Sequence, residues 1–222
     1  MQRITLALSL LAFAVVPAGC SKKDKQSKNP DEASESDLDP LEELKGIPVA
    51  IQGEVDMVMQ PINDVDVVIE QVTSMPGRLG VDAKALTAMA SASFKDGTVA
   101  VNIEVSAEAK AEIEALLQTV KGIAVGLQEI PQRVPVAAKN IVGHGAKGAA
   151  LVAKLTAKYQ AKLAAPFTKA EEKLKIQGEL DMVVKLDADI KATVGSAKDT
   201  VMSVPDKGTE ALAKLTAAFA AG

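Results

Sequence analysis

Three glycines in the second half of the chain have the spacing of a dinucleotide-binding loop. Gly143, Gly145 and Gly148 form the pattern GxGxxG, which lets a backbone approach a pyrophosphate at the start of a helix. Binding the ribose also needs an acidic residue about twenty positions further on. No Asp or Glu occurs between Glu129 and Glu171. We therefore interpret the glycines as a loosened break between two helical segments, and we predict no nucleotide cofactor.

Metal binding and nucleophilic catalysis lack the residues that they usually need. His144 is the only histidine and Cys20 the only cysteine, so neither a His/Cys metal site nor a histidine-based triad can be assembled. Carboxylates close in sequence remain, at Asp64 and Asp66 and at Asp187 and Asp189. We interpret both pairs as solvated helix starts. The sequence thus predicts no catalytic residue, no metal and no cofactor, and an exported hydrolase that uses carboxylates alone is the least favoured class.

Charge is strongly segregated along the chain. Residues 31–70 hold twelve acids and one base, whereas residues 130–170 hold seven bases and no acid. Five of these bases fall within a sector of about 140° on a helical wheel: Lys139, Lys147, Lys154, Lys158 and Lys162. Val142, Leu151 and Leu155 are expected opposite them. This basic amphipathic helix suits an anionic membrane surface or an envelope protein. The alternatives are a solvated face, or contact with the acidic segment of the same or a neighbouring molecule.

The first twenty residues carry an export signal. Arg3 precedes an apolar run of thirteen residues from Ile4 to Val16, followed by Pro17-Ala18-Gly19 and Cys20. This arrangement resembles a bacterial lipoprotein signal, although Pro17 replaces the usual large apolar residue. The resemblance implies that residues 1–19 are removed, that Cys20 is acylated, and that the protein is anchored to a membrane. Cleavage after Ala18 by ordinary signal peptidase is the alternative.

The resemblance also bears on which membrane holds the protein. Ser21 follows the cysteine, where Asp resembles the usual signal for retention in the inner membrane. We therefore expect the outer membrane, with the protein facing the periplasm. Residues 20–40 contain one large apolar side chain and are predicted to be a disordered tether, and residues 41–222 a single domain.

Aromatic residues are almost absent from this domain. It contains Phe94, Tyr159, Phe167 and Phe219 and no tryptophan. The core must therefore be aliphatic, and the stacking surfaces on which bases and sugars usually rest are scarce. We predict that nucleic acid is not a partner.

A short internal repeat suggests how the domain is built. Ile51–Val58 recurs as Ile176–Val183 with one substitution in eight residues, and prolines follow at Pro76, Pro131 and Pro205. We infer three divergent copies of one unit, near residues 49–94, 98–165 and 174–220.

Each copy opens with alternating apolar residues, for example Val99, Val101 and Ile103, which favours a half-buried strand. The first copy also fits a helix, but Pro61 would interrupt it. Asp96-Gly97 is a hairpin signal, and Ser106 and Asp187 are plausible N-caps.

The predicted fold class is therefore α+β. A small, mainly antiparallel sheet would be covered by long Ala-rich helices, in three strand–helix–Pro–helix repeats, with an all-α bundle as the alternative. We expect a non-enzymatic, lipid-anchored envelope protein that acts as a structural or interaction module. A periplasmic carrier of lipid or another apolar ligand is the alternative function.

Overall fold

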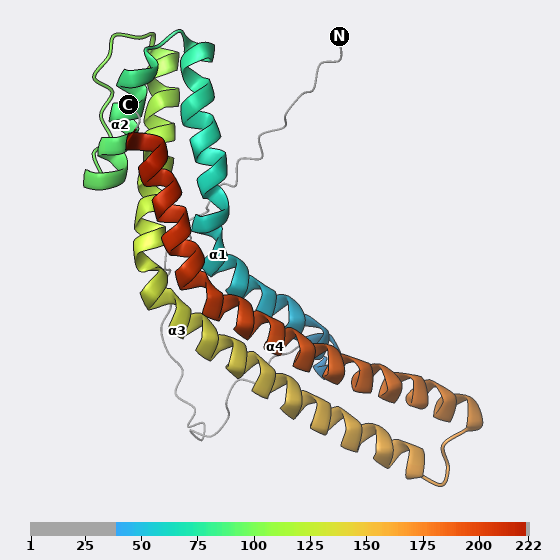
Figure 1. The fold of residues 1–222 in the computed structure, drawn as a ribbon. Coiled ribbons are helices and arrows are strands. Elements are labelled where there is room, and N and C mark those ends of the chain that lie inside the picture. Colours follow the sequence, from blue (N-terminus) through green and yellow to red (C-terminus); the bar gives the residue numbers. More distant parts are fainter. Residues whose placement is uncertain (1–38, 221–222) are drawn as a thin grey trace, which may run out of the picture. The chain divides into compact units, whose positions relative to one another are not determined.

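The computed structural model describes residues 39–220, and these are helical apart from short connections (Figure 1). The helices are α1 (Pro40–Leu79), α2 (Ala83–Asp96), α3 (Ala107–Ala164) and α4 (Ala170–Ala220). The prediction of an α+β fold is therefore wrong. Within residues 39–220 there is no strand, and the fold class is all-α. The predicted leader and nearly all of the tether lie outside the described residues.

Local sequence accounts for where the helices begin and end. Asp39, Asp82 and Ser106 are N-caps whose side-chain oxygens accept hydrogen bonds from backbone N–H groups of the first turn, at 3.3, 2.7 and 3.2 Å. Gly80 and Gly97 end α1 and α2 with φ of 66°, a left-handed conformation that glycine adopts without steric cost. The N-cap predicted at Ser106 is confirmed, whereas Asp187 lies inside α4.

The three long helices pack through a seven-residue repeat. Buried residues recur every seven positions on α1, at Leu44, Ile51, Val58, Val65 and Val72. The same spacing occurs on α3, at Ile113, Val120, Leu127, Val134, Ile141, Gly148 and Leu155. It also occurs on α4, at Ile176, Val183, Ile190, Ala197, Val204 and Ala211. Because 3.5 residues per turn keep one stripe of a helix facing its neighbour, this spacing buries a continuous apolar seam between helices.

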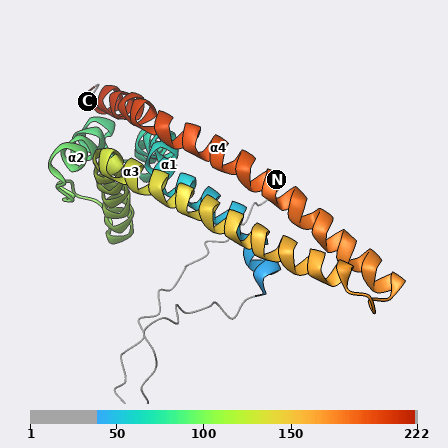
Figure 2. The ribbon, with the colours of Figure 1, turned by 90° about the horizontal axis from the view of Figure 1, so that it is seen from below.

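Contacts between the helices define their directions. Lys147 of α3 is paired with Glu43 of α1, while Arg78 near the end of α1 is paired with Glu112 near the start of α3. α1 and α3 therefore run antiparallel. α3 and α4 form an antiparallel hairpin through the turn at residues 165–169, so α1 and α4 run in the same direction (Figures 1 and 2). The short helix α2 packs against all three long helices, most extensively against α3.

The prolines that we expected to separate strands and helices lie inside helices. Pro61 and Pro76 belong to α1, Pro131 to α3 and Pro205 to α4. Figure 1 shows that the long helices bend along their length, and an internal proline is a usual cause of a bend because it removes one backbone hydrogen bond. Pro61 is itself buried, so its ring adds to the core.

The predicted repeat unit does not correspond to a structural unit. The first range, 49–94, covers parts of α1 and α2, the second covers a connection and α3, and the third covers α4. The repeated eight-residue segments themselves are helical in both places. Gln52 donates to Asp56 at 2.8 Å and Gln177 donates to Asp181 at 3.1 Å, so the two segments share the same side-chain hydrogen bond.

The segment 98–105 connects α2 to α3 without regular secondary structure, so the predicted strand is absent there. The alternating apolar residues Val99, Val101 and Ile103 nevertheless pack, partly buried, against the helical core. The hairpin signal at Asp96-Gly97 is instead the end of α2, since Gly97 supplies the positive φ of a helix C-cap. A dipeptide that favours a positive φ serves a β-turn and a helix end equally well.

Candidate functional site

Polar residues interrupt the apolar seam between α1 and α3. Glu54 lies seven residues after the buried Ile47, and His144 lies seven residues after the buried Ala137, so both occupy positions of the core repeat. Glu54 accepts a hydrogen bond from Asn140 Nδ2 at 3.1 Å, and its other oxygen lies 3.8 Å from His144 Nε2. The side chains of Glu54 and His144 are 16% and 31% exposed. A polar layer of this kind fixes the alignment of two helices, because shifting them would separate the partners.

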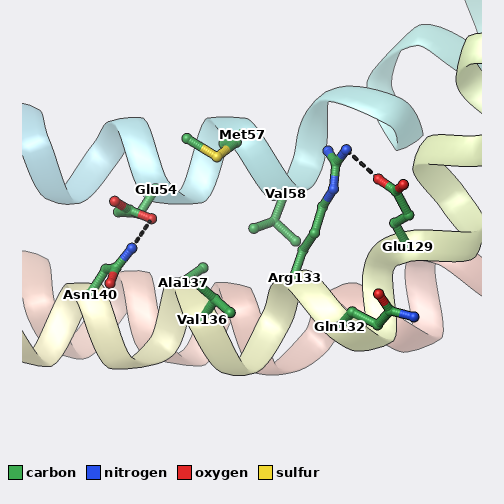
Figure 3. A pocket seen from close by; sticks show the side chains of 9 residues that line it. All are labelled: Glu54, Met57, Val58, Glu129, Gln132, Arg133, Val136, Ala137 and Asn140. Atoms are coloured by element: carbon green, nitrogen blue, oxygen red, sulfur yellow. Dashed lines mark hydrogen bonds and ion pairs between the residues drawn. The ribbon is translucent and has the colours of Figure 1, made fainter.

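A groove of about 670 Å³ between α1 and α3 begins at this polar layer. Figure 3 shows Glu54 and Asn140 at one end and Arg133 with Glu129 at the other, where the guanidinium and the carboxylate are 2.5 Å apart. Apolar side chains line the part between these ends, at Met57, Val58, Val136 and Ala137. The groove therefore has an apolar middle part, as binding surfaces usually do, and at each end a pair of polar side chains that interact with each other.

The five lysines singled out in the sequence all lie exposed on the second half of α3. Lys147 forms an ion pair with Glu43 of α1 at 2.6 Å, so one of them contacts an acid of the same molecule. Leu151 and Leu155, which were expected opposite the lysines, are buried, whereas Val142, expected on the same side, is 55% exposed. The difference arises because the buried stripe follows the seven-residue repeat through Ile141, which turns Val142 outward.

The glycines of the GxGxxG pattern lie within the continuous helix α3, so the predicted helix break is wrong. A Cβ at Gly145 would lie 2.9 Å from a methyl of Val194, and one at Gly148 would lie 3.2 Å from Ile190. These distances are shorter than ordinary carbon contacts. Gly145 and Gly148 therefore allow α3 and α4 to approach closely.

The acidic pairs lie within α1 and α4 rather than at helix starts, and one member of each pair contacts a lysine. Asp66 of α1 lies 3.2 Å from Lys214 of α4, and Asp187 lies 2.6 Å from Lys191 one turn further along α4. In the part of the chain from 39 to 220, no three His, Cys, Asp or Glu side chains gather as metal ligands would. Cys20 lies outside the described residues.

Phe167 was not among the site residues predicted from the sequence. It lies in the turn between α3 and α4 and is 95% exposed. The other described aromatics are in the core: the rings of Phe94 and Phe219 pack edge to face with centroids 6.1 Å apart, and Tyr159 is buried. The signal in the sequence was an aromatic side chain directly after Pro166, in a stretch between two helical patterns.

Tyr159 lies near the same end of α3 and has an unusual electrostatic setting. Burial raises the pKa of its phenol above the ordinary value of 10.0, and the carboxylate of Glu179, to which the hydroxyl donates a hydrogen bond, raises it further. Asp39, at the start of α1, acts in the same direction.

Comparison of the chain with protein-family models, with curated proteins and with solved structures gave no match. Among the described helices, none combines the length and the apolar composition needed to span a bilayer.

Proposed function

We propose that this protein is a lipid-anchored component of a bacterial cell envelope that acts as a non-enzymatic structural or interaction module. Cys20 is the acylated residue, and residues 20–40 connect it to the helical bundle. The membrane is the outer membrane, with the bundle in the periplasm. The bundle contacts anionic lipid or an envelope protein through the lysine row, defined as Lys139, Lys147, Lys154, Lys158 and Lys162.

The observation that carries this proposal is the distribution of charge on α3. Its second half has no acid and presents the lysine row to solvent, whereas Glu108, Glu112 and Glu114 lie in its first turns. A lipid chain and a basic surface together give firmer attachment than either one alone, because each lysine near an anionic surface adds about 1 kcal/mol.

The anchor is tested by mass spectrometry of the N-terminal peptide of the protein purified from bacterial membranes. The proposal predicts a peptide that begins at Cys20 and carries a diacylglyceryl group and a further acyl chain. A Cys20→Ser variant should carry no lipid, whereas Ser21→Ala, as the matched control, should keep it. An unmodified peptide that begins at Gly19 would show cleavage by ordinary signal peptidase and would contradict the proposal.

The groove between α1 and α3 supports the alternative function, a carrier of lipid or another apolar ligand. Met57 and Val136 are exposed within it, and its volume suits part of an acyl chain. Organic extraction of the purified protein, followed by mass spectrometry, distinguishes the two functions. Stoichiometric lipid beyond that attached to Cys20, reduced by Val136→Glu, would favour the carrier. An extract free of it would favour the module.

A further inference from the structure

We infer that the turn between α3 and α4 is a membrane contact, in which Phe167 inserts into the interface of an anionic bilayer. The turn comprises residues 165–169, and we refer to it as the hairpin tip. This inference rests on the proposed attachment to a membrane. It goes further by naming the part of the bundle that meets the lipid and the side chain that enters it.

The exposure of Phe167 is the first observation. The whole chain has four phenylalanines, one tyrosine and no tryptophan, and Phe167 is the aromatic that the structure leaves 95% exposed. Single exposed aliphatic residues are common on protein surfaces. An aromatic ring at the end of a helical hairpin, next to the exposed Pro166, is instead placed where it can leave water without any change in the fold.

The charges around the hairpin tip identify the kind of surface. Residues 150–178 contain two acids, Glu171 and Glu172, and six lysines. Exposed lysines flank Phe167 on both sides of the turn, at Lys158, Lys162, Lys169, Lys173 and Lys175. Leu174, on the first turns of α4, adds a second exposed apolar side chain. Apolar side chains surrounded by lysines match a bilayer interface that carries anionic lipid, where the ring leaves water while the ammonium groups stay at the headgroups.

The start of α1 lies nearer to the hairpin tip than to the beginning of α3, because Glu43 pairs with Lys147, whereas Arg78 pairs with Glu112. Lys147 lies 17 residues before α3 ends at Ala164, which is roughly 25 Å along the helix axis. The nineteen residues from Cys20 to Asp39 can reach at most roughly 65 Å. Because this reach exceeds the distance from the start of α1 to the hairpin tip, the connection allows the hairpin tip to contact the membrane that holds Cys20.

A tryptophan at position 167 tests the inference directly, because the chain contains no other tryptophan. Phe167→Trp is purified from bacterial membranes as the cells process it, and is reconstituted in vesicles of phosphatidylglycerol and phosphatidylcholine or of phosphatidylcholine alone. Met202→Trp is the matched control, since Met202 is an exposed apolar residue of α4 far along the helix from the tip. Circular dichroism verifies that both variants keep the helical fold.

We expect the emission of Phe167→Trp to shift to the blue and to be quenched by brominated phospholipid in anionic vesicles at low salt. Both effects should be lost in phosphatidylcholine vesicles or in high salt, and Met202→Trp should show neither. If the protein floats with anionic vesicles while the emission at position 167 stays as in buffer, the inference about the tip is wrong and the membrane anchor stands. If the emission shifts although Cys20 is found unmodified, the anchor is wrong and the tip stands. A blue shift that rises with protein concentration without vesicles would show contact with a second copy and would overturn the inference.

Discussion

A close contact between α1 and α3 gives a quantitative test of how the bundle is packed. A Cβ added at Gly126 of α3 would lie 2.7 Å from Cγ and 3.0 Å from Cβ of Pro61 in α1. Carbon atoms in contact are ordinarily about 3.5–4.0 Å apart. Because the proline ring is rigid, it cannot rotate away, and Gly126→Ala must push the two helices apart.

The expected magnitude follows from two opposing terms. Glycine in a helix is about 1 kcal/mol less favourable than alanine, so the substitution by itself stabilises α3. Overpacking a core typically costs about 1–3 kcal/mol. Gly122, four residues earlier on α3, has nothing within 4 Å of the position of its Cβ and supplies the matched control. Gly122→Ala should raise the free energy of unfolding by about 1 kcal/mol, and Gly126→Ala should fall below it by about 1–3 kcal/mol.

Urea unfolding followed by circular dichroism measures both variants. Repeating the pair in a Pro61→Ala background forms a double-mutant cycle. Without the ring, the penalty at Gly126 should shrink, and the two alanine substitutions should become similar. Equal stabilisation by Gly122→Ala and Gly126→Ala in the original background would refute the close contact, and with it the alignment of α1 on α3.

Three further predictions concern side chains at defined points of the bundle. The raised pKa of Tyr159 means that the folded state favours the neutral phenol. The stability that this phenol contributes is therefore present below pH 10.0 and is lost as the pH rises further. Tyr159→Phe should reduce this alkaline loss of stability, measured by urea unfolding across pH, and an unchanged pH profile would argue against it. Ser93 is buried and donates a hydrogen bond to the Leu117 carbonyl at 2.6 Å. Ser93→Ala should therefore lower the free energy of unfolding by about 0.5–1.5 kcal/mol. An unaltered denaturation midpoint would contradict this hydrogen bond between α2 and α3. Because the φ of Gly97 is 66°, Gly97→Ala should lower the free energy of unfolding by about 1–2 kcal/mol. Gly97→Asn should lower it by less, and equal losses in the two variants would speak against a left-handed cap.

The spacing of apolar residues predicts that α1 is helical, and Pro61 does not interrupt the helix. Apolar residues spaced four and three apart, such as Ile51, Val55 and Val58, are buried as that pattern predicts. A proline within a helix costs about 3 kcal/mol in isolation. In this bundle its ring is buried against α3 at Gly126, and packing of this kind cannot be read from α1 alone.

The strand assignments failed because alternation over a few residues is ambiguous. In the segment 174–184, the helical repeat buries Ile176 and Val183, seven residues apart, while Leu174 and Val184 are exposed. A period of two and a period of 3.5 share several positions over such a short range. Along the whole of α4 the seven-residue spacing continues to Ile190, which favours the helix.

The candidate sites were predictable to different degrees. The exposed lysine row followed from helical periodicity and charge alone. The polar layer of Glu54, Asn140 and His144 could not be found in this way, because it depends on which turn of α1 faces which turn of α3. The exposure of Phe167 likewise depends on where the α3–α4 hairpin turns.

The most direct test of the proposed function is the reactivity of the lysine row in the anchored protein. The protein is reconstituted in anionic or zwitterionic vesicles and treated with an amine-acetylating reagent, and the modified lysines are quantified by mass spectrometry. We predict slower acetylation of Lys139, Lys158 and Lys162 on anionic vesicles at low salt, reversed by high salt. Lys110, exposed in the first turns of α3, should react equally in every condition. Equal acetylation of the lysine row on both kinds of vesicle would contradict contact with an anionic membrane.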